Sequence, residues 1–190
     1  MIRLGASRMI KSVEECSISI EEVVDFGIII FKADFSDTQT RNLLKATTGV
    51  EVPGIGKISI DEKFSIAWMS TDEYAIILKR RESDKIAKKI ITKMKNKHHL
   101  CVNMSDSRRC FRLLGKGWRE VLSKGIPADL NPDVFGVGAF RRTRIANVAV
   151  AIWTISNNEA FLVSSYSVGS FIFDWLKTAS LKTGQVSYYR

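Results

Sequence analysis

Cysteine, proline and histidine are scarce in this 190-residue chain, and no long hydrophobic run occurs in it. The three cysteines, Cys16, Cys101 and Cys110, lack CxxC spacing, so we expect reduced thiols and no disulfide framework. His98 and His99 are adjacent and would point to opposite sides of an extended segment, which argues against a metal site. No apolar run approaches the ~18 residues of a membrane span, and the amino terminus has no signal-peptide pattern. We therefore expect a cytoplasmic protein without a membrane partner.

Positive charge is in excess: 29 lysines and arginines face 20 aspartates and glutamates, a net charge of +9. Many of the cations crowd residues 79–97, which also contain one predicted buried stripe of a helix: Ile86, Ile90, Ile91 and Met94. Lys88 and Lys89 are expected to face away from that stripe. The segment lacks the interleaved aromatic residues that a single-strand binder uses, so we favour a solvated or partner-facing surface. A basic nucleic-acid-binding module remains an alternative interpretation.

Hydrophobic patterning predicts short strands that alternate with helices along the whole chain. The expected strands span residues 25–35, 64–69, 74–78, 100–104, 109–114, 141–145, 148–155 and 160–163. Short helices are expected at residues 38–47 and 118–123, and longer helices at 83–97 and about 165–179.

The order strand, short helix, loop, hairpin and long helix occurs twice, which predicts an internal repeat. Trp68 and Trp153 are expected at equivalent buried positions of the two hairpins, while Gly49 and Gly125 end the two short helices. We therefore predict an α+β fold of two similar βαββα-like halves, whose small antiparallel sheets pack with helices. The alternative is a chance alternation of strands and helices. The predicted organisation is an arm (1–16), two halves (17–98 and 99–180) and a tail (181–190).

No group of residues has the spacing of a catalytic, cofactor or metal site. Gly54-Ile55-Gly56 lacks the third glycine of a dinucleotide fingerprint and does not open a helix. A nucleophile and its base can lie far apart in sequence, so that arrangement stays open. The interpretation we favour is a chain without catalytic, cofactor-binding or metal-binding residues of its own.

The last helix is the strongest candidate interaction surface. Five large apolar residues lie within six positions and would cover more than half of its circumference: Phe171, Ile172, Phe173, Trp175 and Leu176. If one stripe packs on the chain's own sheet, Phe171 or Phe173 is left near the surface as an interface anchor. Lys88 and Lys89 would supply an electrostatic face for an acidic partner. Burial of both surfaces between the two halves is the alternative.

Several segments carry a family resemblance: WMSTDEY (68–74), VNMSDSR (102–108), FRLLG (111–115), VLSKGIPADL (121–130), Phe135, Gly138, Arg142-Thr143 and DWL (174–176). As an ordered set they resemble the gamma subunits of heterotetrameric sarcosine oxidases, small members of the aminomethyltransferase (glycine-cleavage T-protein-like) group. Asn103 and Asp106 stand where that family often has aspartate and histidine. We expect Asn103 and Ser105 to satisfy backbone groups at the end of a strand instead.

The resemblance implies an aminomethyltransferase folate-binding-domain-like fold and a non-catalytic, structural gamma subunit. Such a complex oxidises sarcosine to glycine with oxygen, forms peroxide and can pass the one-carbon unit to tetrahydrofolate. The resemblance also implies alpha, beta and delta subunits as partners, with FAD, FMN, NAD, zinc and tetrahydrofolate held by those partners. A stand-alone folate-dependent one-carbon transferase is the alternative, which the substitutions at Asn103 and Asp106 weaken.

Overall fold

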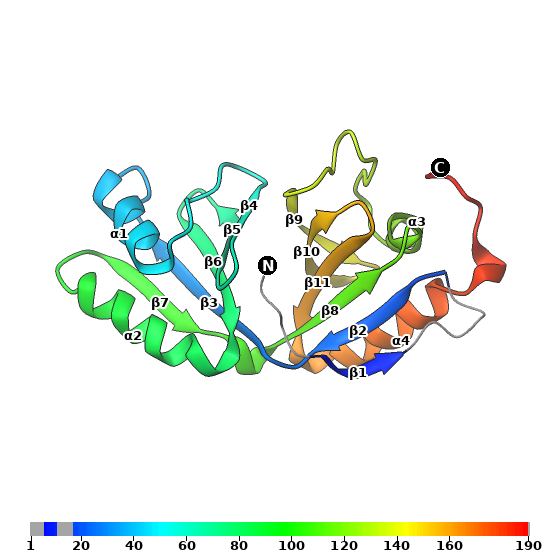
Figure 1. Cartoon of the computed structure of the whole chain (residues 1–190), viewed down its shortest axis with the longest axis horizontal. Coiled ribbons are helices and arrows are strands. Elements are labelled where there is room, and N and C mark those ends of the chain that lie inside the picture. The colour runs from blue at the N-terminus through cyan, green and yellow to red at the C-terminus, as the bar shows by residue number, and fades with distance from the viewer. Residues whose placement is uncertain (1–5, 11–16, 190) are drawn as a thin grey trace. The chain divides into compact units, whose positions relative to one another are not determined.

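The computed structural model describes residues 6–10 and 17–189, which fall into two compact units (Figure 1). Unit 1 contains residues 25–106, and unit 2 contains the described residues of 6–24 together with 107–189. The chain crosses between the units at Val24–Asp25 and again at Asp106–Ser107. Within the described residues, no helix is both long and apolar enough to cross a membrane.

Unit 1 is a five-stranded antiparallel sheet in the order β4-β5-β6-β3-β7, packed with two helices. The strands are β3 (Phe26–Ala33), β4 (Ile58–Ile60), β5 (Ser65–Ser70), β6 (Glu73–Lys79) and β7 (His99–Asn103), and the helices are α1 (Thr38–Thr48) and α2 (Ser83–Lys93). The Asp37 side chain caps α1 by accepting from the Gln39 amide, and Gly49 ends this helix with a φ of 78°. Ile29 and Phe31 of β3 and Ile90 of α2 share the core between sheet and helices.

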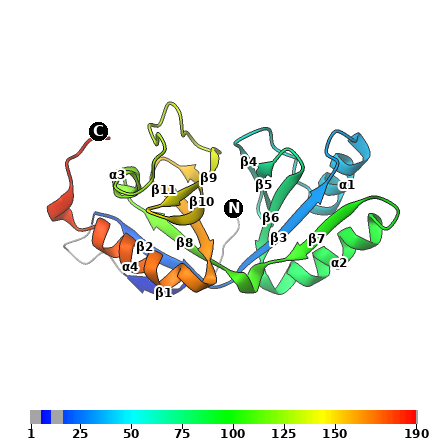
Figure 2. The ribbon, with the colours of Figure 1, turned by 180° about the vertical axis from the view of Figure 1, so that it is seen from behind.

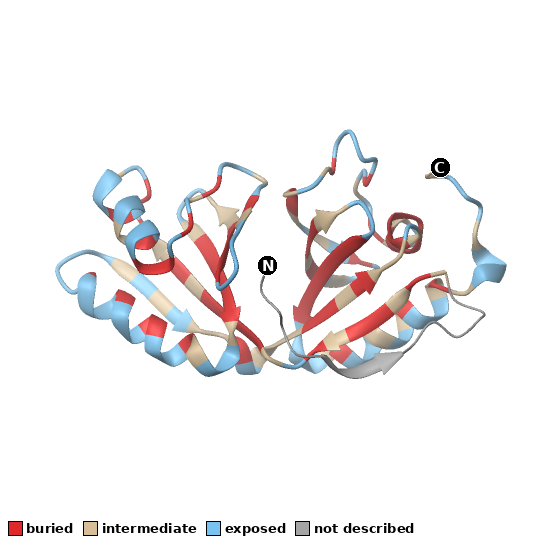
Figure 3. Ribbon diagram, viewed as in Figure 1, coloured by how far each residue is buried: buried red, intermediate tan, exposed pale blue. Residues whose placement is uncertain are grey.

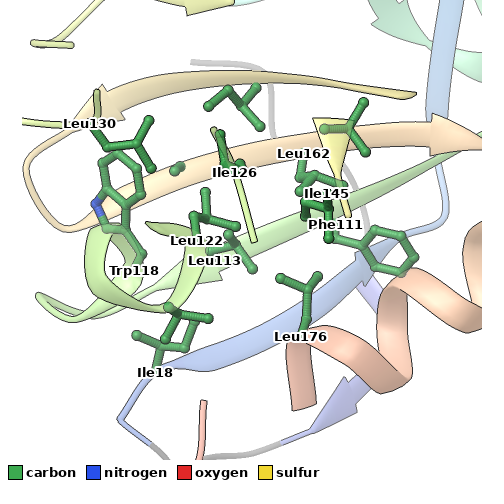
Figure 4. Packing of buried hydrophobic residues seen from close by; sticks show 14 of the residues in the cluster. Ile18, Phe111, Leu113, Trp118, Leu122, Ile126, Leu130, Ile145, Leu162 and Leu176 are labelled. Carbon is green, nitrogen blue, oxygen red and sulfur yellow. The ribbon is translucent and has the colours of Figure 1, made fainter. Parts of the chain in front are cut away.

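Unit 2 is a six-stranded antiparallel sheet in the order β1-β2-β8-β11-β10-β9, also packed with two helices. Its strands are β1 (Ala6–Ile10), β2 (Ser19–Val23), β8 (Arg108–Leu114), β9 (Phe140–Ile145), β10 (Val148–Ser156) and β11 (Glu159–Ser165), and its helices are α3 (Trp118–Ser123) and α4 (Gly169–Ala179). Figure 4 shows the core, in which Phe111 and Leu113 of β8 meet Leu122 of α3 and Leu176 of α4.

The predicted fold class is confirmed, because both units repeat one plan of an antiparallel sheet packed with two helices. The two helices of unit 1 are equally long, 11 residues each, whereas in unit 2 α3 is shorter than α4. The predicted halves 17–98 and 99–180 do not coincide with the units, however. Strand β2 precedes β3 in sequence but pairs with β8 in unit 2, and β7 precedes β8 but pairs with β3 in unit 1. The first strand of each half therefore completes the other unit's sheet. Hydrophobic alternation predicts a strand without naming the partner it pairs with.

The two ends of the chain also differ from the prediction of a loose arm and a tail. Residues 6–10 of the predicted arm form β1, which pairs antiparallel with β2, while 1–5 and 11–16 lie outside the described residues. In the predicted tail, the Tyr189 hydroxyl lies 3.0 Å from Ser123 Oγ of α3. The Val186 amide donates to the Glu120 carboxylate of the same helix. Residues 181–189 therefore belong to the packing of unit 2.

The tryptophans of the two hairpins are not equivalent, contrary to the prediction. In unit 1, Trp68 pairs with Tyr74 immediately before an irregularity in the β5–β6 ladder. In unit 2, the pair at the same place in the β10–β11 ladder is Thr154 with Ala160, and Trp153 lies one residue earlier. Because successive side chains of a strand point to opposite faces, a shift of one residue changes the face.

The two indoles consequently have different surroundings. Trp68 is partly buried against the core that the helices of unit 1 cover. Trp153 lies on the other face of its sheet, where its ring stacks on Phe161 at 5.2 Å and on Phe140 at 6.2 Å between ring centroids. The aromatic anchors are thus packing residues in both units, but they do not mark the repeat.

Candidate interaction surfaces

The described thiols are unsuited to nucleophilic chemistry. Cys101 on β7 is half-buried, and its Sγ lies 3.8 Å from the Ala87 carbonyl oxygen of α2. Burial raises the pKa of the Cys101 thiol to about 11, and burial also raises the pKa of the fully buried Cys110 thiol. Both thiols are therefore protonated at neutral pH, and the thiolate is the reactive form. Within residues 6–10 and 17–189, no group of three or more histidine, cysteine, aspartate or glutamate side chains could hold a metal ion.

Polar residues at the end of β7 have the structural role that the sequence predicted. Ser105 Oγ accepts a hydrogen bond of 3.0 Å from the Ile28 amide at the start of β3. The Asn103 side chain accepts from the Ser105 amide at 3.1 Å and donates to Asp84 of α2 at 2.7 Å. Asp106 forms an ion pair with Arg80. These residues join a strand end, a strand start and a helix start, and their hydrogen bonds serve the fold of unit 1.

Helix α4 divides the aromatic candidates Phe171 and Phe173 between solvent and core. Ile172 and Leu176 of this helix are fully buried in the core of unit 2. Phe173 is half-buried against that core, with its ring centroid 6.0 Å from that of Phe111. Phe171 is 49% exposed. Of the two residues proposed as interface anchors, Phe171 is therefore the exposed one, and Phe173 packs against the core.

A partly buried ion pair lies at the start of α4, next to Phe171. Arg109 of β8 donates two hydrogen bonds of 2.7 Å to the Glu22 carboxylate of β2. Hydrogen bonding to Glu22 raises the pKa of the Arg109 guanidinium, so this side chain stays charged. Arg109 also donates to Ser170 Oγ at 3.1 Å, and it lies 5.9 Å from the ring centroid of the exposed Tyr166. Arg109 thus contacts the exposed Tyr166 and Ser170, the residue that precedes Phe171.

Lys88 and Lys89 of helix α2 are exposed to solvent, as the sequence predicted. Figure 3 shows exposed residues along this helix. Its buried side consists of Ser83, Ile86, Ala87 and Ile90. Successive positions of a helix are 100° apart, so the two lysines do not point in one direction. Lys88 lies one turn after Asp84, whose carboxylate contacts Asn103 of β7, and it therefore belongs to the flank of the helix next to β7.

Three exposed apolar side chains near this flank were missed by sequence reasoning. Leu100 and Val102 of β7 are 49% and 37% exposed, and Ile91 of α2 is 44% exposed. The alternation of residues 99–103 predicts a strand with one buried face, but it cannot tell that the strand lies at an edge of the sheet. Position at an edge depends on pairing, which is set by the whole fold.

Comparison with known proteins shows which family the sequence matches. Residues 32–182 match the family model of the sarcosine oxidase gamma subunit family. The sarcosine oxidase subunit gamma of Corynebacterium sp. (strain P-1) is 26% identical over 115 residues, which are 60% of this chain and 56% of that relative. The chain thus spans little more than half the length of this curated relative.

Two solved structures share the fold. A chain of the heterotetrameric sarcosine oxidase from Corynebacterium sp. U-96, in complex with pyrrole 2-carboxylate, superposes with a TM-score of 0.80 at 24% identity, over 88% of this chain and 86% of that chain. The glycine cleavage system aminomethyltransferase T from Bartonella henselae superposes with a TM-score of 0.63 at 8% identity, over 85% of this chain and 46% of that chain. At these identities the likeness is one of fold.

Proposed function

The chain belongs to the sarcosine oxidase gamma subunit family, and from this premise we propose that it is the non-catalytic gamma subunit of a heterotetrameric sarcosine oxidase. In this proposal its partners are the alpha, beta and delta subunits. The partners hold FAD, FMN, NAD, zinc and tetrahydrofolate, oxidise sarcosine to glycine and pass on the one-carbon unit. The observation that carries the proposal is the family match over residues 32–182.

The chemistry of the described residues supports a structural role. The thiols of Cys101 and Cys110 have raised pKa values because they are buried. The polar groups at the end of β7 are engaged in hydrogen bonds within unit 1. The exposed features are instead of the kind that binds proteins. One is the exposed aromatic side chain of Phe171, and the other is the basic helix α2 together with the exposed apolar residues of β7.

Co-expression tests the proposal. The chain would be produced together with the large flavin subunits of a sarcosine oxidase from the same source, and the complex purified through a tag on one of those subunits. We expect the chain to co-purify, and the complex without it to lose stability or sarcosine-dependent peroxide formation. If the chain stays in the unbound fraction, and the complex oxidises sarcosine and resists heating equally well without it, the proposal is wrong. Tetrahydrofolate binding by the isolated chain would favour a stand-alone transferase instead.

A further inference from the structure

The internal repeat shows an asymmetry at one edge of the two sheets. In unit 2, β2 pairs with β8 on one side and with β1 on the other. In unit 1, β7 has the corresponding place beside β3, and it is the last strand of its sheet (Figure 2). No strand of the described residues pairs with the outer side of β7. The same fold thus carries an added strand in one unit and an open edge in the other.

The register identifies which backbone groups of β7 face the open edge. The Met104 amide donates to the Ile28 carbonyl oxygen at 2.8 Å, just beyond the end of β7. Antiparallel ladders alternate between bonded and non-bonded pairs, so Val102 and Leu100 continue the bonding to β3. The amide and carbonyl groups of His99, Cys101 and Asn103 are consequently directed outward. Ala33 supports this phase, because its amide donates to Asp72 at the opposite side of β3.

The side chains along the edge offer two different faces to an added strand. Leu100 and Val102 lie on the sheet face away from α2, because Cys101 between them contacts that helix. On the other face, Ile91 and Lys88 lie on the flank of α2 next to β7. Helix α2 carries four lysines and one acidic residue, Asp84, so its exposed surface is basic as a whole. Of these lysines, Lys88 lies on the flank next to β7, where the Asp84 carboxylate already accepts a hydrogen bond from Asn103. The edge thus offers apolar side chains on one face, and on the other face Lys88 is the cation nearest to it.

We propose that the open edge of β7 accepts an extended, acidic segment of a partner subunit as a sixth strand of unit 1. Residues of that segment that point toward α2 carry carboxylates, and the alternate residues are apolar and cover Leu100 and Val102. The inference rests on the proposed function, in that the partner is a subunit of the same complex. Pairing with a second copy of the chain is disfavoured, because antiparallel pairing of β7 with itself would bring two basic α2 helices to one side of the sheet.

Amide hydrogen exchange at single-residue resolution tests strand addition. We would compare the full-length chain alone with the chain in the co-purified complex. The amides of His99, Cys101 and Asn103 should exchange at least about tenfold more slowly in the complex, because each gains a hydrogen-bond acceptor. Those of Leu100 and Val102 should change less, since they are already bonded to β3. Uniform protection, or none, in an assembled complex would overturn the inference and leave the proposed function standing.

Charge reversal supplies a second test with a control on the same helix. Lys88→Glu should weaken binding of the chain to the large subunits by about tenfold, whereas Lys93→Glu on the opposite flank should leave it unchanged. Equal effects of the two variants would overturn the acidic-segment proposal. Alternating protection in the isolated chain at high concentration would mean that a second copy occupies the edge, which also overturns it. Failure of the unmodified chain to assemble would overturn the proposed function and this inference together.

Discussion

Replacing Arg119 with alanine is expected to destabilise unit 2 by about 3 kcal/mol. This arginine lies in α3 and is only 3% exposed. Its Nη1 donates to the carbonyl oxygens of Leu130 and Phe135, at 2.6 and 2.9 Å, and its guanidinium lies 4.2 Å from the ring centroid of Trp118. These two hydrogen bonds connect the loop between α3 and β9, at Leu130 and at Phe135, to helix α3.

The magnitude follows from opposing contributions. Hydrogen bonds from a charged donor contribute about 1.5–3 kcal/mol each, and the cation–π contact about 0.5–2 kcal/mol. Against this, burial of a guanidinium costs several kcal/mol, and Arg119 Nη2 has no partner among the described residues. Alanine removes the burial cost but leaves the carbonyls of Leu130 and Phe135 without donors, at about 1–3 kcal/mol each. The orphaned carbonyls decide the sign, so the variant is less stable.

Urea unfolding, followed by tryptophan fluorescence, measures this difference. Arg144→Ala is the matched control, because Arg144 on β9 is exposed and its loss should change the unfolding free energy by less than about 0.5 kcal/mol. Arg119→Met keeps much of the bulk while removing the donors. If Arg119→Met were as stable as the unmodified chain, the burial cost would outweigh the two hydrogen bonds, and the reasoning would be refuted.

Three further results are expected. Phe171→Ser should weaken subunit binding, measured by pull-down, at unchanged thermal stability, because Phe171 is exposed. Phe173→Ala should lower the unfolding free energy by about 2 kcal/mol, measured by calorimetry, because Phe173 packs against the core. Cys101, with its pKa raised to about 11 by burial, should react with iodoacetamide at pH 8 about 100-fold more slowly than a thiol of pKa 9.0, and a normal rate would contradict its burial. Hydrogen bonding to Lys97 lowers the pKa of Asp37 below 3.8, so its contribution to stability is present above that pH and lost as pH falls through the folded pKa. Asp37→Asn should reduce the acid sensitivity of urea unfolding, and an unchanged pH profile would contradict this.

Local patterns in the sequence were sufficient for the elements that alternate or cap clearly. The glycine that ends α1 was predicted from residue type, and the burial of Ile86 and Ile90 of α2 from spacing. Ile91, predicted in the same buried stripe, is instead 44% exposed. The hairpins of both units were predicted because polar turn residues separate two apolar runs. These features depend on neighbours within a few positions, which a single sequence records.

Features that depend on pairing could not be predicted. The exchange of β2 and β7 between the units requires knowing which strands form hydrogen bonds, and β2 itself carries two glutamates that obscure its apolar side. The predicted equivalence of Trp68 and Trp153 is wrong because a shared aromatic residue type does not fix the register of a strand. The ladder irregularity next to each turn is the better marker, since it fixes the face of every residue beside it. The exposed edge of β7 was missed for the same reason.

The most direct test of the central claim is the mass of the intact sarcosine-oxidising complex. The complex would be purified through a tag on its large flavin subunit and weighed by native mass spectrometry. A gamma subunit predicts a four-component assembly that contains one copy of this 21.4 kDa chain, and loss of that mass when the chain is omitted. The account would be contradicted if the fully active complex had a mass that its other subunits explain completely. It would also be contradicted if omitting the chain left the mass unchanged.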